Sequence, residues 1–217
     1  MKQKHILVVL PHPDDEVFPM SGTLSKYIHE GAYVTYVCLT LGEMGRNLGN
    51  PAFANRVSLP SVRKQELENS CKIIGIQDLR LWGYHDKTVE FEAFEPLDQR
   101  ILEIIEEVEP ELVYTFYPGH GVHPDHNACG AAVIRTVQSM PAAERPIVHC
   151  CAFPNAALGK ADISNDITPY LDQKIGTLNA HGSQFQAYLD LTVGNHTDPA
   201  FMKRIKTEQF WLYPFKD

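Results

Sequence analysis

The stretch Pro11-His12-Pro13-Asp14-Asp15-Glu16 directly follows the apolar run His5-Ile6-Leu7-Val8-Val9-Leu10. An unbroken run of this kind, rich in β-branched residues, is typical of a parallel strand buried on both faces. The histidine and the three acids therefore lie where the strand ends, which is the edge at which open α/β sheets bind ligands. From Val17 to Gly31, apolar residues recur at helical spacing before a glycine stop, so the acids lie at the entry to a helix.

A second cluster of the same kind is His120-Gly121-Val122-His123-Pro124-Asp125-His126, which follows the apolar run 112–116. Acids that open a helix are stabilised by its dipole, so either cluster alone is compatible with simple capping. The occurrence of two histidine and carboxylate clusters, each at the end of a buried strand, favours a shared site instead.

Strand and helix alternate up to about residue 150, which predicts an α/β fold with a parallel, doubly wound sheet. Small residues at 128 and 130–132 predict a close approach of one helix to the sheet. The further expected strands are 32–41, 79–82, 112–116, 147–153 and 208–213. The further expected helices are 62–74, 96–109, 127–140 and 169–179. The loops expected at the ligand edge are 11–19, 42–60, 83–95 and 117–126.

The length of 217 residues predicts one domain, 1–217. A formal charge of -8 without a lysine or arginine run argues against nucleic acid or an anionic membrane as the main partner. No apolar run reaches the ~20 residues of a membrane span, and the N-terminus enters a strand directly, so we expect a cytoplasmic protein. The five cysteines form no C-x-x-C pair, and we expect them to be reduced and structural.

The two clusters supply the donor set of a catalytic zinc site, which commonly has three nitrogen or oxygen ligands and an open position for water. His12 and Asp15 are three residues apart across one turn and can meet at one cation. We favour His126 as the third ligand over His123, because His126 lies at a helix start that fixes its direction.

Three further residues remain for chemistry. Asp14 fits the base that takes a proton from water, and His123 fits an imidazolium that stabilises the oxyanion or protonates the leaving group. Asp125 fits the carboxylate that orients His123. We expect Glu16 to be structural, and His120 to lie outside the ligand set while remaining a rival to His123. Arg63 and Glu66 are expected to form a surface ion pair.

The two motifs at 11–16 and 123–126 resemble the zinc-dependent N-acetylglucosaminyl deacetylases of the PIG-L and LmbE type. The resemblance is greatest to the second type of deacetylase in bacillithiol biosynthesis, which implies N-acetylglucosaminyl malate as substrate. Further matches to the family extend over nearly the whole chain and comprise Thr40 to Gly45, Arg63 to Glu66, Gly83 to Asp86, His181-Gly182-Ser183-Gln184 and Glu208-Gln209-Phe210.

The resemblance implies a Rossmann-like fold, the same zinc ligands and base, and a homo-oligomer (trimer or hexamer). Iron(II) is an alternative metal, since nitrogen and oxygen ligands select weakly among such ions. The resemblance gives Asp86 a role at the glucosamine hydroxyls and implies that an arginine reaches the sugar or its aglycone, for which Arg46, Arg56 and Arg63 compete. In one departure, Val122 stands where some relatives carry a tyrosine that assists the oxyanion.

Two other functions stay open at this point. The same residues fit deacetylation of a chitooligosaccharide or of another N-acetylated metabolite. In a different class, the clusters fit a metal-binding protein without turnover.

Overall fold

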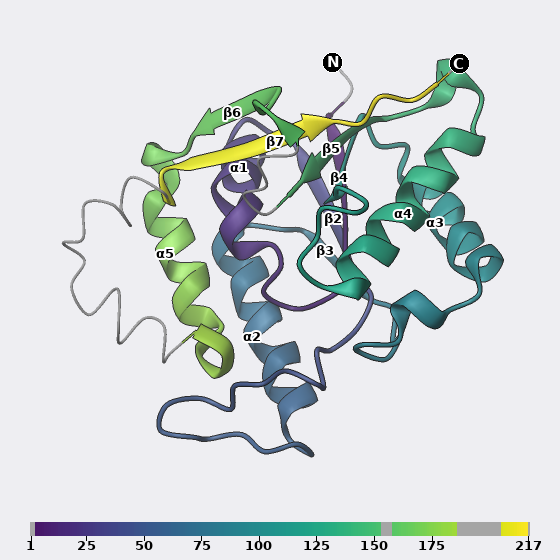
Figure 1. The fold of residues 1–217 in the computed structure, drawn as a ribbon. Coiled ribbons are helices and arrows are strands. Elements are labelled where there is room, and N and C mark those ends of the chain that lie inside the picture. The colour runs from purple at the N-terminus through teal and green to yellow at the C-terminus, as the bar shows by residue number, and fades with distance from the viewer. Residues whose placement is uncertain (1–2, 153–157, 186–204, 217) are drawn as a thin grey trace.

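The computed structural model of the chain describes residues 3–152, 158–185 and 205–216, and its strands form one seven-stranded sheet (Figure 1). The strand order is β3-β2-β1-β4-β5-β7-β6. The strands are β1 His5–Leu10, β2 Tyr33–Cys38, β3 Asp78–Leu81, β4 Leu112–Phe116, β5 Ile147–Cys151, β6 Ile163–Asp166 and β7 Thr207–Leu212.

Strands β1 to β5 pair in parallel, whereas β7 is antiparallel to β5 and β6 is antiparallel to β7. The predicted α/β class and mainly parallel, doubly wound sheet are confirmed. A helix connects each parallel strand to the next along the chain, as parallel pairing requires. The α-helices are α1 Val17–His29, α2 Leu59–Ile74, α3 Phe94–Val108, α4 Pro124–Ser139 and α5 Leu171–Ala180, and short 3-10 helices span Val89–Phe91, Ala142–Glu144 and Thr168–Tyr170.

Helices α1, α2 and α5 cover one face of the sheet, and α3 and α4 cover the other (Figure 1). Successive side chains of a strand point to opposite faces, so β1 serves both layers. Ile6, Val8 and Leu10 pack into the core under α1 and α2, while Leu7 and Val9 pack under α3 and α4. All five are wholly buried, which explains why this strand has no polar position after His5. The five cysteines are free and buried, as expected.

Several element boundaries differ from the predicted ones. Helix α2 begins at Leu59 rather than 62, and α4 begins at Pro124 rather than 127, because a proline in the first turn has no N–H to lose. The sequence does not predict β6, whose residues Ile-Ser-Asn-Asp form a half-polar strand that, among the described strands, pairs with β7 alone. Residue 153, the predicted end of a strand, lies outside the described residues.

The order of the strands places the two histidine clusters together. Strand order reverses between β1 and β4, and ligands of open α/β sheets bind beyond the strand ends at such a point. The residues after Leu10 and after Phe116 therefore face one another. Within the described ranges, no helix has the length and apolar character that a membrane crossing requires.

Helix α4 passes very close to the end of β4 at Gly130. A Cβ atom on Gly130 would lie 2.2 Å from the carbonyl oxygen of Phe116, which is a backbone atom at the end of β4. No methyl group fits in that gap. Gly130 was predicted to allow a close approach of the helix to the sheet, and the structure shows that glycine is required there. The contact sets the distance between α4 and the end of β4, where the site lies.

We expect Gly130→Ala to lower the free energy of unfolding by about 1–3 kcal/mol, the usual cost of overpacking. Gly176→Ala in α5 is the matched control, because its nearest neighbour at 3.1 Å is the partly exposed side chain of Ile73, which can shift. Alanine also favours a helix by about 1 kcal/mol at both positions. Urea unfolding measures both variants, and a Gly130→Ala protein as stable as the parent would contradict the packing account.

Candidate active site

The turn between β1 and α1 fixes the first cluster. His12 and Asp15 are buried, and Asp15 Oδ2 accepts a hydrogen bond from the backbone N–H of His12 at 2.8 Å. Asp14 lies between them with a φ of +93°. A left-handed conformation costs a residue other than glycine about 1–2 kcal/mol, so this turn is held by other contacts. Helix α1 begins directly afterwards, with Glu16 as its N-cap.

His12, Asp15 and His126, the three residues predicted to bind a metal, converge at the strand ends. All three are buried, and their ligand atoms lie within 4.8 Å of one another. Asp15 Oδ1 is 3.0 Å from His126 Nε2, and Asp15 Oδ2 is 3.3 Å from His12 Nδ1. The ring of Phe116 stacks on that of His126 at 4.0 Å, so the end of β4 fixes the plane of this imidazole.

This group of donors fits a metal ion. Ligand atoms about 2.0–2.1 Å from a tetrahedral zinc are about 3.3 Å apart, close to the two separations given above. Two imidazole nitrogens and one carboxylate also match the ligand types of catalytic zinc, with a fourth position left for water. The same donors accept iron(II), because nitrogen and oxygen ligands select weakly among such ions.

A second group with atoms equally close together shares His12 and adds His123 and Asp125. On this side, His12 Nε2 lies 3.1 Å from both Asp125 Oδ2 and Asp86 Oδ1. An imidazole that donates its Nε2–H to a carboxylate presents the lone pair of Nδ1 to a metal. The two carboxylates therefore favour the group with Asp15 and His126 as the metal site.

The charges of these residues are strongly coupled. Burial alone would raise the pKa of Asp15, but His126 and His12 hold it well below its usual value. Burial alone would lower the pKa of His12, but Asp15 and Asp125 raise it well above its usual value. A proton and a metal compete for the same lone pair, so the affinity of this group for a metal should fall as the pH falls.

Asp14 lies beside the metal group and has a different partner. Its Oδ2 accepts a hydrogen bond from Arg63 Nη2 at 2.8 Å, and its side chain keeps 20% of its accessible surface. Burial raises the pKa of Asp14 to about 6, against the opposite effect of Arg63. A carboxylate whose pKa lies close to the working pH is suited to general base catalysis.

Arg63 is buried and held from several sides. Its Nη1 donates to the carbonyl oxygen of Gly42 at 2.9 Å, and its Nη2 also donates to that of Pro13. Gly42 has a φ of +64°, and a Cβ there would lie 1.9 Å from Arg63 Nη1. Only glycine fits, so the loop after β2 closes over the guanidinium that contacts Asp14.

The prediction that Arg63 and Glu66 form a surface ion pair is wrong. Both side chains are buried, and Glu66 accepts hydrogen bonds from the N–H and the hydroxyl of Ser183, each at 2.6 Å. The i,i+3 spacing correctly puts the two residues on one face of a helix. It does not reveal that the loop at Gly42 and the segment after α5 cover that face.

His123 and Asp125 lie at the start of α4. His123 is half-buried and caps the helix, and its Nδ1 accepts the backbone N–H of Asp125 at 3.1 Å. Burial and the nearby His12 lower the pKa of His123. The carboxylate of Asp125, expected to orient His123, instead contacts His12 and accepts the N–H of Lys87 at 2.7 Å. His120 packs its ring on Tyr117 and belongs to neither metal-ligand group.

Asp86, the predicted sugar-binding residue, is buried next to the metal group. Its Oδ1 lies 3.1 Å from His12 Nε2, and its Oδ2 accepts the N–H of Met44 at 2.9 Å. Burial alone would raise the pKa of Asp86, but the hydrogen bond with His12 holds it below its usual value. Arg46 and Arg56 are exposed on the loop after β2. Since Arg63 is buried against Asp14, these two remain for contacts further from the metal.

Sequence reasoning assigned no role to several residues that the structure brings to the site. Glu16, expected to be structural, is wholly buried and accepts hydrogen bonds from His181 Nε2 at 2.7 Å and Ser70 Oγ at 2.6 Å. His181 stood out only as part of the His-Gly-Ser-Gln match to the resembled family, with no role assigned to it. Lys87, with a φ of +67°, donates its N–H to Asp125, and nothing in its sequence context marked it.

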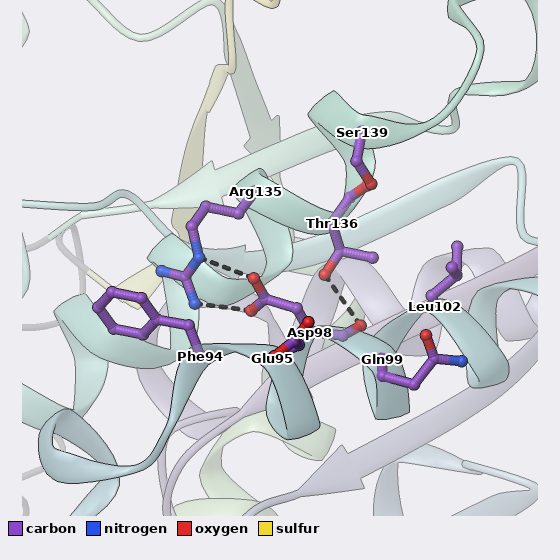
Figure 2. A pocket seen from close by; sticks show the side chains of 8 residues that line it. All are labelled: Phe94, Glu95, Asp98, Gln99, Leu102, Arg135, Thr136 and Ser139. Atoms are coloured by element: carbon purple, nitrogen blue, oxygen red, sulfur yellow. Dashed lines mark hydrogen bonds and ion pairs between the residues drawn. The ribbon is translucent and has the colours of Figure 1, made fainter.

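A hollow of about 500 Å³ lies between α3 and α4, away from the site (Figure 2). Arg135 and Asp98 meet there in a bidentate ion pair with distances of 2.8 and 2.6 Å, and the guanidinium lies 4.2 Å from the ring centre of Phe94. The two charges neutralise each other, and none of the lining residues belongs to either metal-ligand group.

Comparison with known proteins connects this site to one family. The profile of the PIG-L family, described as GlcNAc-PI de-N-acetylase, matches residues 7–137, which include both histidine clusters. A Bacillus cereus protein named probable N-acetyl-alpha-D-glucosaminyl L-malate deacetylase 2 is 47% identical over 219 residues, with 99% of this chain and 100% of that protein covered.

Two solved structures share the fold. The N,N'-diacetylchitobiose deacetylase of Pyrococcus horikoshii has a TM-score of 0.73 and 23% identity, with 98% of this chain and 85% of that chain covered. A 4-carboxy-2-hydroxymuconate hydratase of Pseudomonas putida has a TM-score of 0.75 and 17% identity, with 99% and 98% covered. Because their names describe different reactions, these similarities establish the fold alone.

We expect removal of bound metal by a chelator to lower the melting temperature. An ion that binds only the native state stabilises it by about 4 kcal/mol at a thousandfold excess over its Kd. His126→Ala removes one of three ligands and should abolish both stoichiometric metal and the response to chelator. Elemental analysis and thermal unfolding measure these effects, with the exposed His85→Ala as a control that keeps both. Full metal content in His126→Ala would point to the group with His123 instead.

Proposed function

Since this chain belongs to the PIG-L family of de-N-acetylases, we propose that it hydrolyses the acetamide of an N-acetylglucosamine conjugate, with zinc bound by His12, Asp15 and His126. The observation that carries this proposal is Asp14, a carboxylate beside the metal group but outside it, whose pKa is raised to about 6. A protein that only bound metal would have no use for this base. Three protein ligands also leave a position for water, whereas a structural zinc site is closed by four.

In the proposed reaction, the metal group, Asp14 and His123 each have a separate role. Zinc at this group would lower the pKa of bound water to about 7 and polarise the acetyl carbonyl. Asp14 takes the proton of the attacking water as the oxygen bonds to the acetyl carbon. Asp14 then passes this proton to the amine nitrogen as the C–N bond breaks, so the products are acetate and a free amine. The Nδ1 of His123 accepts the N–H of Asp125, so its Nε2–H serves as the oxyanion donor in this scheme, in place of the hydroxyl that Val122 lacks.

Asp14→Asn separates the base from the metal ligands. The amide keeps the shape of the side chain but accepts no proton, so kcat should fall by the ~10²–10⁴ attributed to a positioned base. Zinc content should stay stoichiometric. Asp15→Asn should instead lose zinc, because a neutral amide oxygen is a poorer ligand than a carboxylate. Steady-state kinetics with elemental analysis checks both variants, and near-normal kcat in zinc-loaded Asp14→Asn would remove Asp14 from the role of base.

The aglycone is proposed to be malate. The support is the name of the Bacillus cereus protein, which is similar to this chain over their whole lengths. The carboxylates around His12 would repel an acidic substrate, so malate needs cationic partners near the mouth of the site. Arg46 and Arg56 are exposed on the loop after β2, and Arg56 donates to the carbonyl oxygen of Gly45. Bidentate arginine is the preferred partner of a carboxylate.

Arg46→Ala or Arg56→Ala should raise KM for N-acetylglucosaminyl malate by about tenfold, which corresponds to one lost charged hydrogen bond of roughly 1.4 kcal/mol. KM for free N-acetylglucosamine should hardly change, because that sugar has no carboxylate. Lys64→Ala, which removes an exposed cation of α2, serves as the control. Equal effects on both substrates would exclude these arginines from aglycone recognition.

Release of amine from a panel of N-acetyl sugars tests the function as a whole. Turnover of N-acetylglucosaminyl malate above free N-acetylglucosamine and diacetylchitobiose, lost with chelator and restored by zinc, is the expected result. Preference for diacetylchitobiose would favour the alternative function, deacetylation of a chitooligosaccharide. Metal binding without amine release from any of them would favour a non-catalytic metal protein. A cytoplasmic location and a homo-oligomer stay predictions.

A further inference from the structure

The backbone conformation of Asp14 needs an explanation that the metal group does not supply. Its φ of +93° is unfavourable for a residue with a side chain, and strain of this kind persists only when the surroundings fix it. The base must also be positioned accurately, since a displacement of about 1 Å can cost roughly 10²-fold in rate.

Glu16 holds the backbone of Asp14 from one side. Its Oε2 accepts the N–H of Asp14 at 3.1 Å and the hydroxyl of Tyr36 at 3.3 Å. Its Oε1 accepts Ser70 Oγ at 2.6 Å and His181 Nε2 at 2.7 Å. The Glu16 carboxylate is wholly buried, so these donors leave it little freedom to move.

His181 is itself fixed by its surroundings. It is wholly buried at the C-terminal end of α5, and two residues later Ser183 donates both its N–H and its hydroxyl to Glu66 of α2. The carbonyl oxygen of Ser183 accepts the N–H of Gly49 at 3.0 Å. The segment after α5 is therefore attached to α2 and to the loop after β2.

Arg63 holds Asp14 from the other side, through the carboxylate. The backbone N–H and the side chain of Asp14 are thus fixed by separate residues, Glu16 and Arg63. We propose that Glu16, held by His181, is a positioning residue that maintains the conformation from which Asp14 acts as a base. His181 lies beyond residues 7–137, so the family profile does not include it. This inference rests on the proposed role of Asp14.

The test is a double-mutant cycle on the zinc-loaded protein. Glu16→Gln replaces one acceptor oxygen by an NH₂ group, so it cannot accept from all four donors. We expect kcat to fall by about 10–100-fold, with KM and zinc content within about twofold of the parent. Combined with Asp14→Asn, the same change should have no further effect on kcat, because Glu16 acts only through Asp14.

Two milder variants go through the same cycle in case Glu16→Gln does not fold. Ser70→Ala and His181→Asn each change one partner of Glu16 Oε1 and leave Oε2 in place, so each should lower kcat less than Glu16→Gln does. Their effects should likewise vanish in the Asp14→Asn background.

The matched control is the double variant Lys174→Met/Glu208→Gln. This ion pair of 2.7 Å is also buried and also joins α5 to α1, because Glu208 accepts the N–H groups of Gly22 and Thr23. The hydrogen bonds that Lys174 and Glu208 make within the described residues do not involve Asp14. We expect a lower melting temperature but kcat per folded enzyme within about twofold of the parent.

The outcomes separate this inference from the proposed function. If Asp14→Asn keeps its kcat, the base assignment fails and the inference fails with it. If Asp14→Asn loses kcat but the Glu16 variants leave it unchanged, or lower it equally in both backgrounds, the function stands and the positioning role is refuted. A fall in kcat equal to that of the control variant would also refute it.

Discussion

The site depends on the accumulation of buried negative charge around one imidazole. Carboxylate oxygens of Asp15, Asp86 and Asp125 all lie within 3.3 Å of a ring nitrogen of His12. Burying an ion costs several kcal/mol unless hydrogen bonds and opposite charge compensate. Each carboxylate accepts one backbone N–H, from His12, Met44 and Lys87 respectively. These dipoles compensate in part, and a divalent cation is the natural source of the remaining positive charge.

The sheet explains why carboxylates so distant in sequence meet. Asp15 follows β1, Asp86 follows β3, and Asp125 follows β4, all at the same edge of parallel strands. Strand β1 is apolar after His5 and supplies no ligand, so the loops beyond the strand ends carry these carboxylates. The contact at Gly130 sets the distance of α4, which carries the second cluster, from the end of β4. The stacking of Phe116 on His126 sets the orientation of the His126 ring.

The fold and the convergence of the two histidine clusters were predictable because both depend on local signals. Apolar runs mark the buried strands, and the residues after each run must lie at one edge, so the convergence of His12, Asp15 and His126 follows from the sequence. The surroundings of Glu66 and Arg63 were not predictable, because a helical pattern does not identify which distant segment covers a polar face. The same holds for Glu16, whose partner His181 is 165 residues away. The edge strand β6 was not predicted from the sequence, because it is short and half polar.

The loop after β2 has two parts with different constraints. Gly42 lies against Arg63, Met44 donates to Asp86, and Gly49 donates to Ser183, so residues 42–49 are bonded to the surroundings of Asp14. Residues 50–57 are mostly exposed. Loop insertions cost little free energy, since closure entropy grows slowly with length. In evolutionary terms, a lineage can therefore lengthen or shorten 50–57 and acquire a new aglycone while the hydrolytic centre keeps its geometry.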